Sequence, residues 1–120
     1  MYIGKVSKLT GASRKAIHHY EEIGLLRGVV RSGKYRTYNE HHVVIISMIK
    51  KAQALGFKLA DVAPLVLAKH VENRFPIEIA NAAIEEKRAK IKLDIQKAKQ
   101  LDVDLVSLKN ELQALFVNTE

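Results

Sequence analysis

The segment from Ile77 to Val117 contains neither glycine nor proline. One uninterrupted helix over this segment would span about 60 Å, because an α-helix rises about 1.5 Å per residue. Apolar residues recur along it at the seven-residue spacing of a coiled coil, with polar exceptions at Lys87 and Asp94. The predicted contact positions are Ile84, Ile91, Ala98, Leu101, Leu105, Leu108 and Leu112.

A helix of this length has more apolar surface than residues 1–76 can cover, so it needs a partner. We expect that partner to be a second copy of the chain, paired in a homodimeric coiled coil. Lys87 and Asp94 then set the register, or lie where the partner helix has already diverged. The alternative is a segment folded back on itself as a hairpin, which the absence of a turn residue around Asp102 and Asp104 disfavours.

The excess of positive over negative charge lies entirely in the first half of the sequence. Residues 1–60 hold 11 Lys and Arg against 3 Asp and Glu, whereas residues 61–120 hold 9 against 10. A basic block on a folded segment is typical of proteins that bind a polyanion, although such charge also serves solubility alone. The two halves are therefore predicted to have different roles.

The first half begins with a predicted pair of short helices. The first covers residues 3–10 and ends at Gly11, and the second begins after Ser13, a good N-cap, and ends at Gly24. This pair has the pattern of a helix-turn-helix. Two short β segments around residues 32–34 (SGK) follow, and they predict a basic hairpin, or wing.

Two more helices are expected before the long one. Asn39 is predicted to cap a helix that ends at Gly56, and a fourth helix covers about 59–69. Pro64 is tolerated in that fourth helix either near its start, if Asp61 is the N-cap, or at a kink. A polar connector over 71–76 then leads to the long helix.

Composition excludes several classes of protein. The sequence has no cysteine, so a disulfide scaffold, a thiolate metal site and a cysteine nucleophile are ruled out. No apolar run is long enough to span a bilayer and no signal-peptide pattern is present, so we expect a cytoplasmic protein without a membrane partner. We expect neither a cofactor nor an enzymatic activity, because no phosphate-binding loop, activated nucleophile or paired acid and base is recognisable.

Four short motifs together resemble the MerR family of transcription regulators. They are the start at 3–4 (IG), the turn at 10–13 (TGAS), the close of the second helix at 19–26 (HYEEIGLL) and the end of the third helix at 55–57 (LGF). Residues 31–38 are similar to the family's wing, and the long helix is similar to its dimerisation helix, so the likeness covers residues 2 to about 115. The resemblance implies a mainly α fold with three parts: a winged helix-turn-helix DNA-binding domain over 1–70, a connector over 71–76, and a dimerisation helix over 77–117 that pairs as an antiparallel coiled coil.

The function that this resemblance implies is sequence-specific transcription regulation. The homodimer would bind a pseudo-palindromic promoter operator and alter transcription by distorting the DNA near RNA polymerase. The alternative is an architectural protein that binds and bends DNA without sensing an effector.

The predicted DNA contacts lie on the second helix and the wing. Lys15 and His18 share one helix face and are the predicted readers of base edges, while Arg14 lies in the first helical turn, beside the phosphates. Tyr20 matches the family tyrosine that donates to phosphate, with core packing as its other role. The full predicted set is Arg14, Lys15, His18, His19, Tyr20, Arg31, Lys34, Arg36 and Tyr38.

The sequence departs from the family pattern in three places. His18-His19 replaces an arginine followed by an aromatic residue, which predicts a different base preference or a pH-dependent affinity. The wing is one residue shorter than usual, and Lys34 replaces its customary glycine. Metal-sensing members bind their ion through cysteines, which this sequence lacks, and adjacent histidines such as His18-His19 and His41-His42 point in different directions on a helix, so no metal site is predicted.

Overall fold

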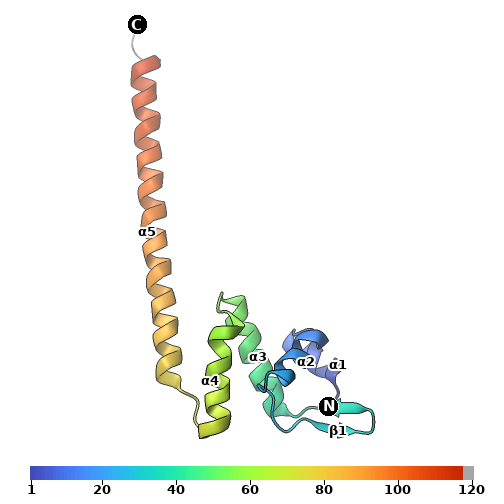
Figure 1. Ribbon diagram of the computed structural model, residues 1–120. Helices are drawn as coiled ribbons and strands as arrows, with labels where there is room; N and C mark the ends of the chain where they lie inside the picture. The colour runs from blue at the N-terminus through green and yellow to red at the C-terminus, as the bar shows by residue number, and fades with distance from the viewer. Residues whose placement is uncertain (118–120) are drawn as a thin grey trace. The chain divides into compact units, whose positions relative to one another are not determined.

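The computed structural model describes residues 1–117 and divides into two compact units, one ending at Pro76 and the other beginning at Ile77. The N-terminal unit holds four helices and a two-stranded hairpin, and the second unit is one long helix, within the described residues (Figure 1). The expectation of a mainly helical chain with a winged helix-turn-helix is confirmed. The elements are α1 (Ile3–Thr10), α2 (Arg14–Glu22), β1 (Val30–Ser32), β2 (Tyr35–Thr37), α3 (Glu40–Ala54), α4 (Leu59–Glu72) and α5 (Ile77–Phe116).

Local capping chemistry sets the ends of α2. The Ser13 hydroxyl accepts a hydrogen bond from the backbone N–H of Ala16 at 3.0 Å, as predicted for an N-cap. At the other end Gly24 adopts φ 84°, and the N–H of Leu25 donates to the carbonyl of Tyr20 at 2.9 Å. This is a Schellman motif, which needs a residue with positive φ and so explains the glycine.

An N-cap and a C-terminal glycine also set the two ends of α3. Asn39 accepts from the N–H of His42 at 3.0 Å, and the Nδ1 atom of His42 accepts from the N–H of Asn39 at 3.1 Å, which forms a capping box. At the C-terminal end Gly56 has φ 95°, and the N–H of Phe57 donates to the carbonyl of Ala52 at 3.0 Å. The Leu-Gly-Phe motif is therefore a second Schellman motif.

Helix α4 begins at Leu59, as predicted, but its N-cap and its C-terminal end settle points that the sequence left open or placed elsewhere. Its N-cap is Lys58, whose N–H donates to the Asp61 carboxylate at 3.1 Å, so the interpretation with Asp61 as N-cap is wrong. Pro64 consequently lies inside the helix, at an exposed position. The helix also continues to Glu72 rather than 69, because Asn73 takes the left-handed conformation (φ 53°) that ends it.

The core of the N-terminal unit lies where α1 packs on α2 and α3, and where α3 packs on α4. Burying an aliphatic side chain of this size contributes about 1.5–3 kcal/mol, so these contacts dominate the stability of the unit. The buried apolar residues are Val6, Ala12, Ile17, Tyr20, Leu25, Leu26, Tyr38, Ile45, Ile46, Ile49, Val62 and Val66.

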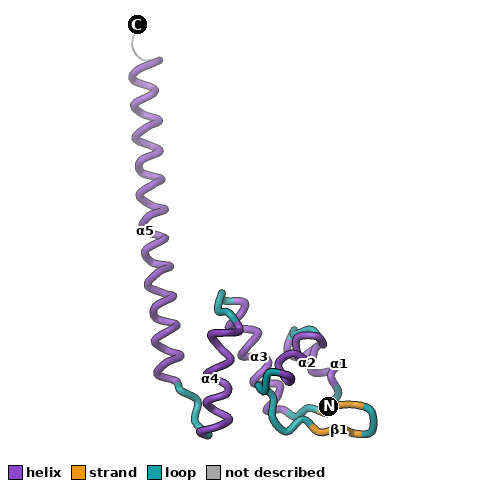
Figure 2. The backbone as a smooth tube through the Cα atoms, in the orientation of Figure 1, coloured by secondary structure: helices purple, strands orange, loops and turns teal. Residues whose placement is uncertain are grey.

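The wing is the antiparallel hairpin of β1 and β2, drawn in orange in Figure 2. Its register pairs Val30 with Thr37 and Ser32 with Tyr35, around a tight turn in which Gly33 has φ 65°. Tyr2 forms an antiparallel bridge with Thr37, which attaches the chain start to β2. The predicted basic hairpin is thus confirmed.

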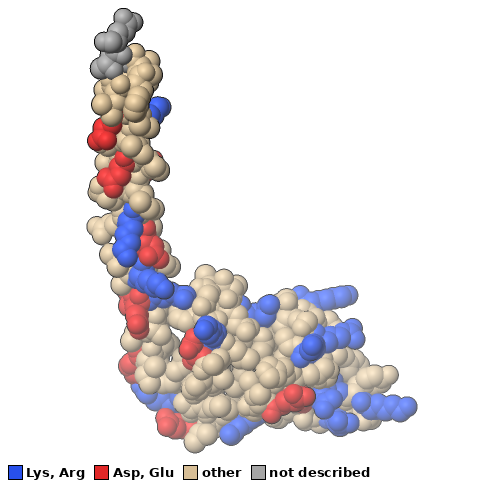
Figure 3. Space-filling view, turned by 45° about the horizontal axis from the view of Figure 1, so that its top comes forward, with Lys and Arg blue, Asp and Glu red and all other residues tan. Residues whose placement is uncertain are grey.

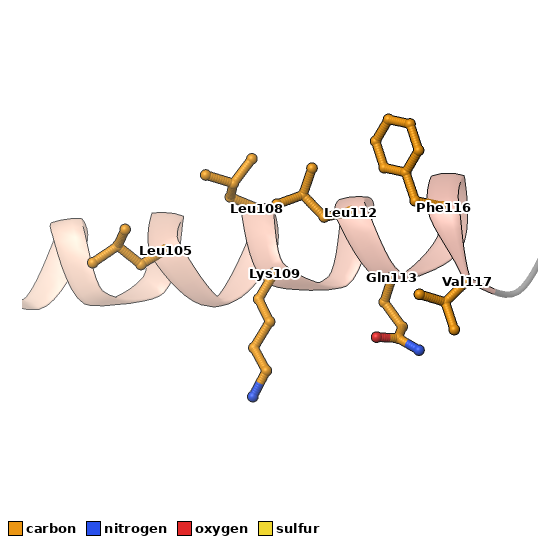
Figure 4. Close-up of a pocket in the computed structure, with 7 residues that line it drawn as sticks. All are labelled: Leu105, Leu108, Lys109, Leu112, Gln113, Phe116 and Val117. Atoms are coloured by element: carbon orange, nitrogen blue, oxygen red, sulfur yellow. The ribbon is translucent and has the colours of Figure 1, made fainter.

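Helix α5 is unbroken from Ile77 to Phe116, so the alternative of a folded-back hairpin is wrong. Six of its seven predicted contact residues are large apolar side chains that are 44–64% exposed. In Figure 4, which shows the distal end, Leu108, Leu112 and Phe116 project to one side, whereas Lys109 and Gln113 project to the other. Over its described residues the helix therefore presents an exposed apolar face.

No helix within the described residues combines the length and apolar character needed to cross a membrane.

Candidate nucleic-acid interface

Exposed cations gather on the part of the N-terminal unit formed by α1, α2 and the wing, and Figure 3 shows Lys and Arg side chains projecting from that unit. Sequence reasoning missed the two lysines of α1, although both belong to the basic first half of the sequence. Clustered cations of this kind raise the local potential and attract a polyanion. The exposed members of this group are Lys5, Lys8, Arg14, Lys15, Arg31 and Lys34.

Helix α2 presents four of the predicted DNA contacts at least partly to solvent. Arg14 and Lys15 are exposed in its first turn, where backbone N–H groups also point outward. His18 is half-buried and lies one turn beyond Lys15 on the same face. His19 is exposed, with its Nδ1 atom 4.0 Å from the Glu22 carboxylate. The helix can therefore offer charged donors to phosphates and polar edges to bases.

The Arg14 side chain crosses to the first turn of α1. A Cβ atom at Gly4 would lie 2.9 Å from the Nη2 atom of Arg14, closer than van der Waals contact allows. Because Gly4 of the Ile-Gly motif has no side chain, the Arg14 guanidinium can lie against the first turn of α1. A sequence pattern cannot reveal the contact, because the two residues belong to different helices.

Tyr20 and Tyr38 are core residues in this structure. They are 2% and 3% exposed, and the Tyr20 hydroxyl donates to the Oε1 atom of Gln53 at 2.9 Å. Burial raises the pKa of both hydroxyls, and for Tyr38 the nearby Glu21 carboxylate raises it further while Arg36 lowers it. In this conformation neither ring faces solvent, so the predicted DNA contacts of these two tyrosines remain predictions.

The wing carries Arg31 and Lys34 as exposed cations, while Arg36 is half-buried and bound to α2. The Nε atom of Arg36 lies 2.8 Å from one carboxylate oxygen of Glu21 and 3.2 Å from the other. Sequence reasoning missed this pair, because its members are 15 residues apart and belong to a helix and a strand.

Histidine 42 is a structural residue. It is 1% exposed, its Nδ1 atom completes the capping box of α3, and its Nε2 atom donates to the carbonyl of Arg27. The neighbouring His41 is exposed, and slight burial together with Lys69, His42 and His70 lowers its pKa. Among residues 1–117, no three His, Asp or Glu side chains are grouped so that they could hold a metal ion.

Two protein-family models match this chain. The model described as "MerR HTH family regulatory protein" matches residues 1–69, and the model "MerR, DNA binding" matches residues 43–115. This chain belongs to the MerR family. It is accordingly a transcription regulator with a DNA-binding helix-turn-helix.

Two curated MerR-type relatives show the extent of the likeness. The HTH-type transcriptional regulator CueR of Escherichia coli O6:H1 is 34% identical over 116 residues, which cover 96% of this chain and 80% of that protein. The HTH-type transcriptional regulator HmrR of Sinorhizobium medicae is 35% identical over 86 residues, which cover 71% of this chain and 58% of that protein.

Two solved structures share the MerR fold with this chain. The lead(II) complex of the transcription regulator PbrR691 from Ralstonia metallidurans aligns with a TM-score of 0.61 at 24% identity, over 92% of this chain and 86% of that one. HiNmlR, described as a MerR family regulator lacking the sensor domain and bound to promoter DNA, aligns with a TM-score of 0.64 at 20% identity, over 96% of this chain and 89% of that one.

Proposed function

We propose that this MerR-family protein binds a pseudo-palindromic promoter operator as a homodimer and regulates transcription by distorting the DNA. The observation that carries the proposal is the set of exposed cations on α1, α2 and the wing, whereas the second unit holds no such excess of positive charge. A relative of the same fold, HiNmlR, is described as bound to promoter DNA. Because the ligand is promoter DNA, RNA polymerase on the same promoter is the proposed further partner and the cytoplasm the proposed location.

Arg14, Lys15, Arg31, Lys34 and Arg36 are the proposed phosphate contacts, while Lys15 and His18 are the proposed readers of base edges. His19 is exposed beside these two and is kept in the proposed contact set. Tyr20 and Tyr38 are proposed to act through the core that supports α2 and β2, given their burial.

Selection of bound sequences from random DNA tests the proposal. The expected result is enrichment of a two-fold symmetric sequence, whose affinity falls steeply with salt by about 0.9 in log K per neutralised phosphate. A flat sequence profile with strong binding would instead support the architectural alternative. Absence of binding at low salt would contradict both.

The homodimer is proposed to form along α5, whose apolar face is exposed and has no buried residue within the described residues. A lone 40-residue helix of this kind gains stability mainly by burying such a face against another helix. Its antiparallel orientation is testable because the sequence has no native cysteine. With single-cysteine variants at Ile84, Ala98 and Leu112, a parallel pair would cross-link at all three, whereas an antiparallel pair cross-links only near its two-fold axis.

A further inference from the structure

The Glu21–Arg36 pair joins α2 to the wing. Glu21 lies in the last turn of α2, and Arg36 is the middle residue of β2. Both carboxylate oxygens face the same Nε atom of the arginine, at 2.8 and 3.2 Å. The side chains are only 22% and 36% exposed, so solvent screens this pair less than a surface pair.

The contact leaves the terminal nitrogens of Arg36 available. A guanidinium has five N–H donors in a rigid fork, and the carboxylate uses the one on Nε. Within residues 1–117 the two terminal nitrogens of Arg36 have no hydrogen-bond partner. They carry four N–H donors in the geometry that suits a phosphate.

We propose that Glu21 is a positioning residue for DNA binding, which holds Arg36 by Nε so that its terminal nitrogens are directed to a backbone phosphate. This inference rests on the proposed function, because it needs DNA as the ligand. Pairing the guanidinium in advance reduces the side-chain freedom that Arg36 would otherwise lose on binding. The pair also couples the wing to α2, so that the position of the wing relative to α2 is fixed when both contact the duplex.

Because Glu21 is negatively charged, the direction in which its removal changes DNA affinity tests the proposal. A carboxylate near a polyanion repels it, so removing one without any other effect strengthens DNA binding. Loss of a positioning contact weakens binding instead. Glu22 supplies the matched control, because it is the neighbouring acid on α2, its side chain is 75% exposed, and it lies 4.0 Å from His19 of the same helix rather than against the wing.

The experiment measures the affinity of the full chain for a duplex recovered by selection, with Glu21→Ala and Glu22→Ala each made in the native and in the Arg36→Ala background. We expect Glu21→Ala to weaken binding about three- to tenfold and to lower the salt slope by up to about 0.9, because one phosphate contact is lost. We expect Glu22→Ala to leave affinity unchanged or slightly higher. In the Arg36→Ala background both Glu21→Ala and Glu22→Ala should strengthen binding. With Arg36 absent, each change only removes the repulsion between a carboxylate and the DNA.

Equal strengthening by Glu21→Ala and Glu22→Ala in the native background would overturn the proposal. If Glu21→Ala fails to fold, judged by its thermal unfolding curve, Glu21→Asp replaces it, since it keeps the charge but is too short to reach Arg36 at the same distance. If Glu21 positions Arg36, Glu21→Asp binds DNA more weakly than the control Glu22→Asp. Equal affinity of the two variants would refute the proposal. If the native protein binds no duplex at all, the proposed function fails before this inference is reached.

Discussion

Tyr20 and Tyr38 are two buried rings that differ at the hydroxyl. The Tyr20 hydroxyl is bonded to Gln53, whereas the Tyr38 hydroxyl is buried and has no hydrogen-bond partner within the described residues. An unpartnered buried hydroxyl loses its bonds to water without compensation, which costs about 1–3 kcal/mol. The two tyrosines therefore respond differently to loss of the hydroxyl.

Replacing Tyr38 by phenylalanine is expected to raise the free energy of unfolding by about 1 kcal/mol, because the ring packing stays and the unpartnered group is removed. Tyr20→Phe is the matched control and should lower it by about 1 kcal/mol, because Gln53 then loses its donor. Urea unfolding measures both values. The same variants test the DNA contacts, since a tyrosine that donates to phosphate would lose affinity as phenylalanine. Unchanged affinity for Tyr38→Phe is the expected outcome.

The raised pKa of these hydroxyls predicts a loss of stability in alkali. Above about pH 10 the unfolded chain releases tyrosine protons that the folded chain retains, so the free energy of unfolding falls as pH rises. Urea unfolding at about pH 9 and about pH 11 measures the fall. The fall should be smaller for Tyr38→Phe than for the native chain, and an equal fall would show that Tyr38 ionises as readily in the folded state as in the unfolded one.

At the scale of the elements, short local motifs account for most helix ends. Ser13 and Asn39 cap α2 and α3, and Gly24 and Gly56 end them in Schellman motifs, all at positions predicted from the sequence. The end of α4 at Asn73 was not predicted, because only a minority of asparagines adopt the left-handed conformation. The sequence left the position of Pro64 within its helix open, because Lys58 begins the helix without the side-chain acceptor that usually marks an N-cap.

Pro64 lies in the interior of α4 and lacks the N–H that would bond to the preceding turn. Because its side chain is exposed, replacing it by alanine changes little packing. We expect Pro64→Ala to raise the free energy of unfolding by about 1–3 kcal/mol, measured by thermal or urea unfolding. Ala60→Ser, an exposed change in the same helix, serves as a control with an effect below about 0.5 kcal/mol. A decrease for Pro64→Ala would mean that the proline is favoured by a contact or a bend that alanine removes.

At the scale of the whole molecule, charge and apolar surface are divided between the two units. The N-terminal unit has its own buried core and the exposed cations, whereas α5 has no buried residue within its described length. A chain divided in this way makes its proposed DNA contacts with one unit and its proposed self-association with the other.

Substitution at the distal end of α5 tests that division. Leu112→Asp places a charge on the apolar side seen in Figure 4, whereas Gln113→Asp places the same charge on the opposite side of the same turn. We expect Leu112→Asp to weaken dimerisation at least about tenfold, because a buried leucine contributes about 1.5–3 kcal/mol per chain. Gln113→Asp should change it little. Sedimentation equilibrium over a range of concentrations measures both, and equal dimerisation by the two variants would exclude this face from the interface.

The sequence by itself determined the helices, the wing, the location of the positive charge and the unbroken long helix. These features depend on neighbours along the chain: a capping side chain, a glycine at positive φ, a heptad spacing. Only the tertiary structure decided that Arg36 is held by Glu21, that Arg14 rests on Gly4, and that the Tyr38 hydroxyl is buried without a partner. Each of these depends on side chains from different elements, and their distances and burial are set by how those elements pack rather than by the order of residues.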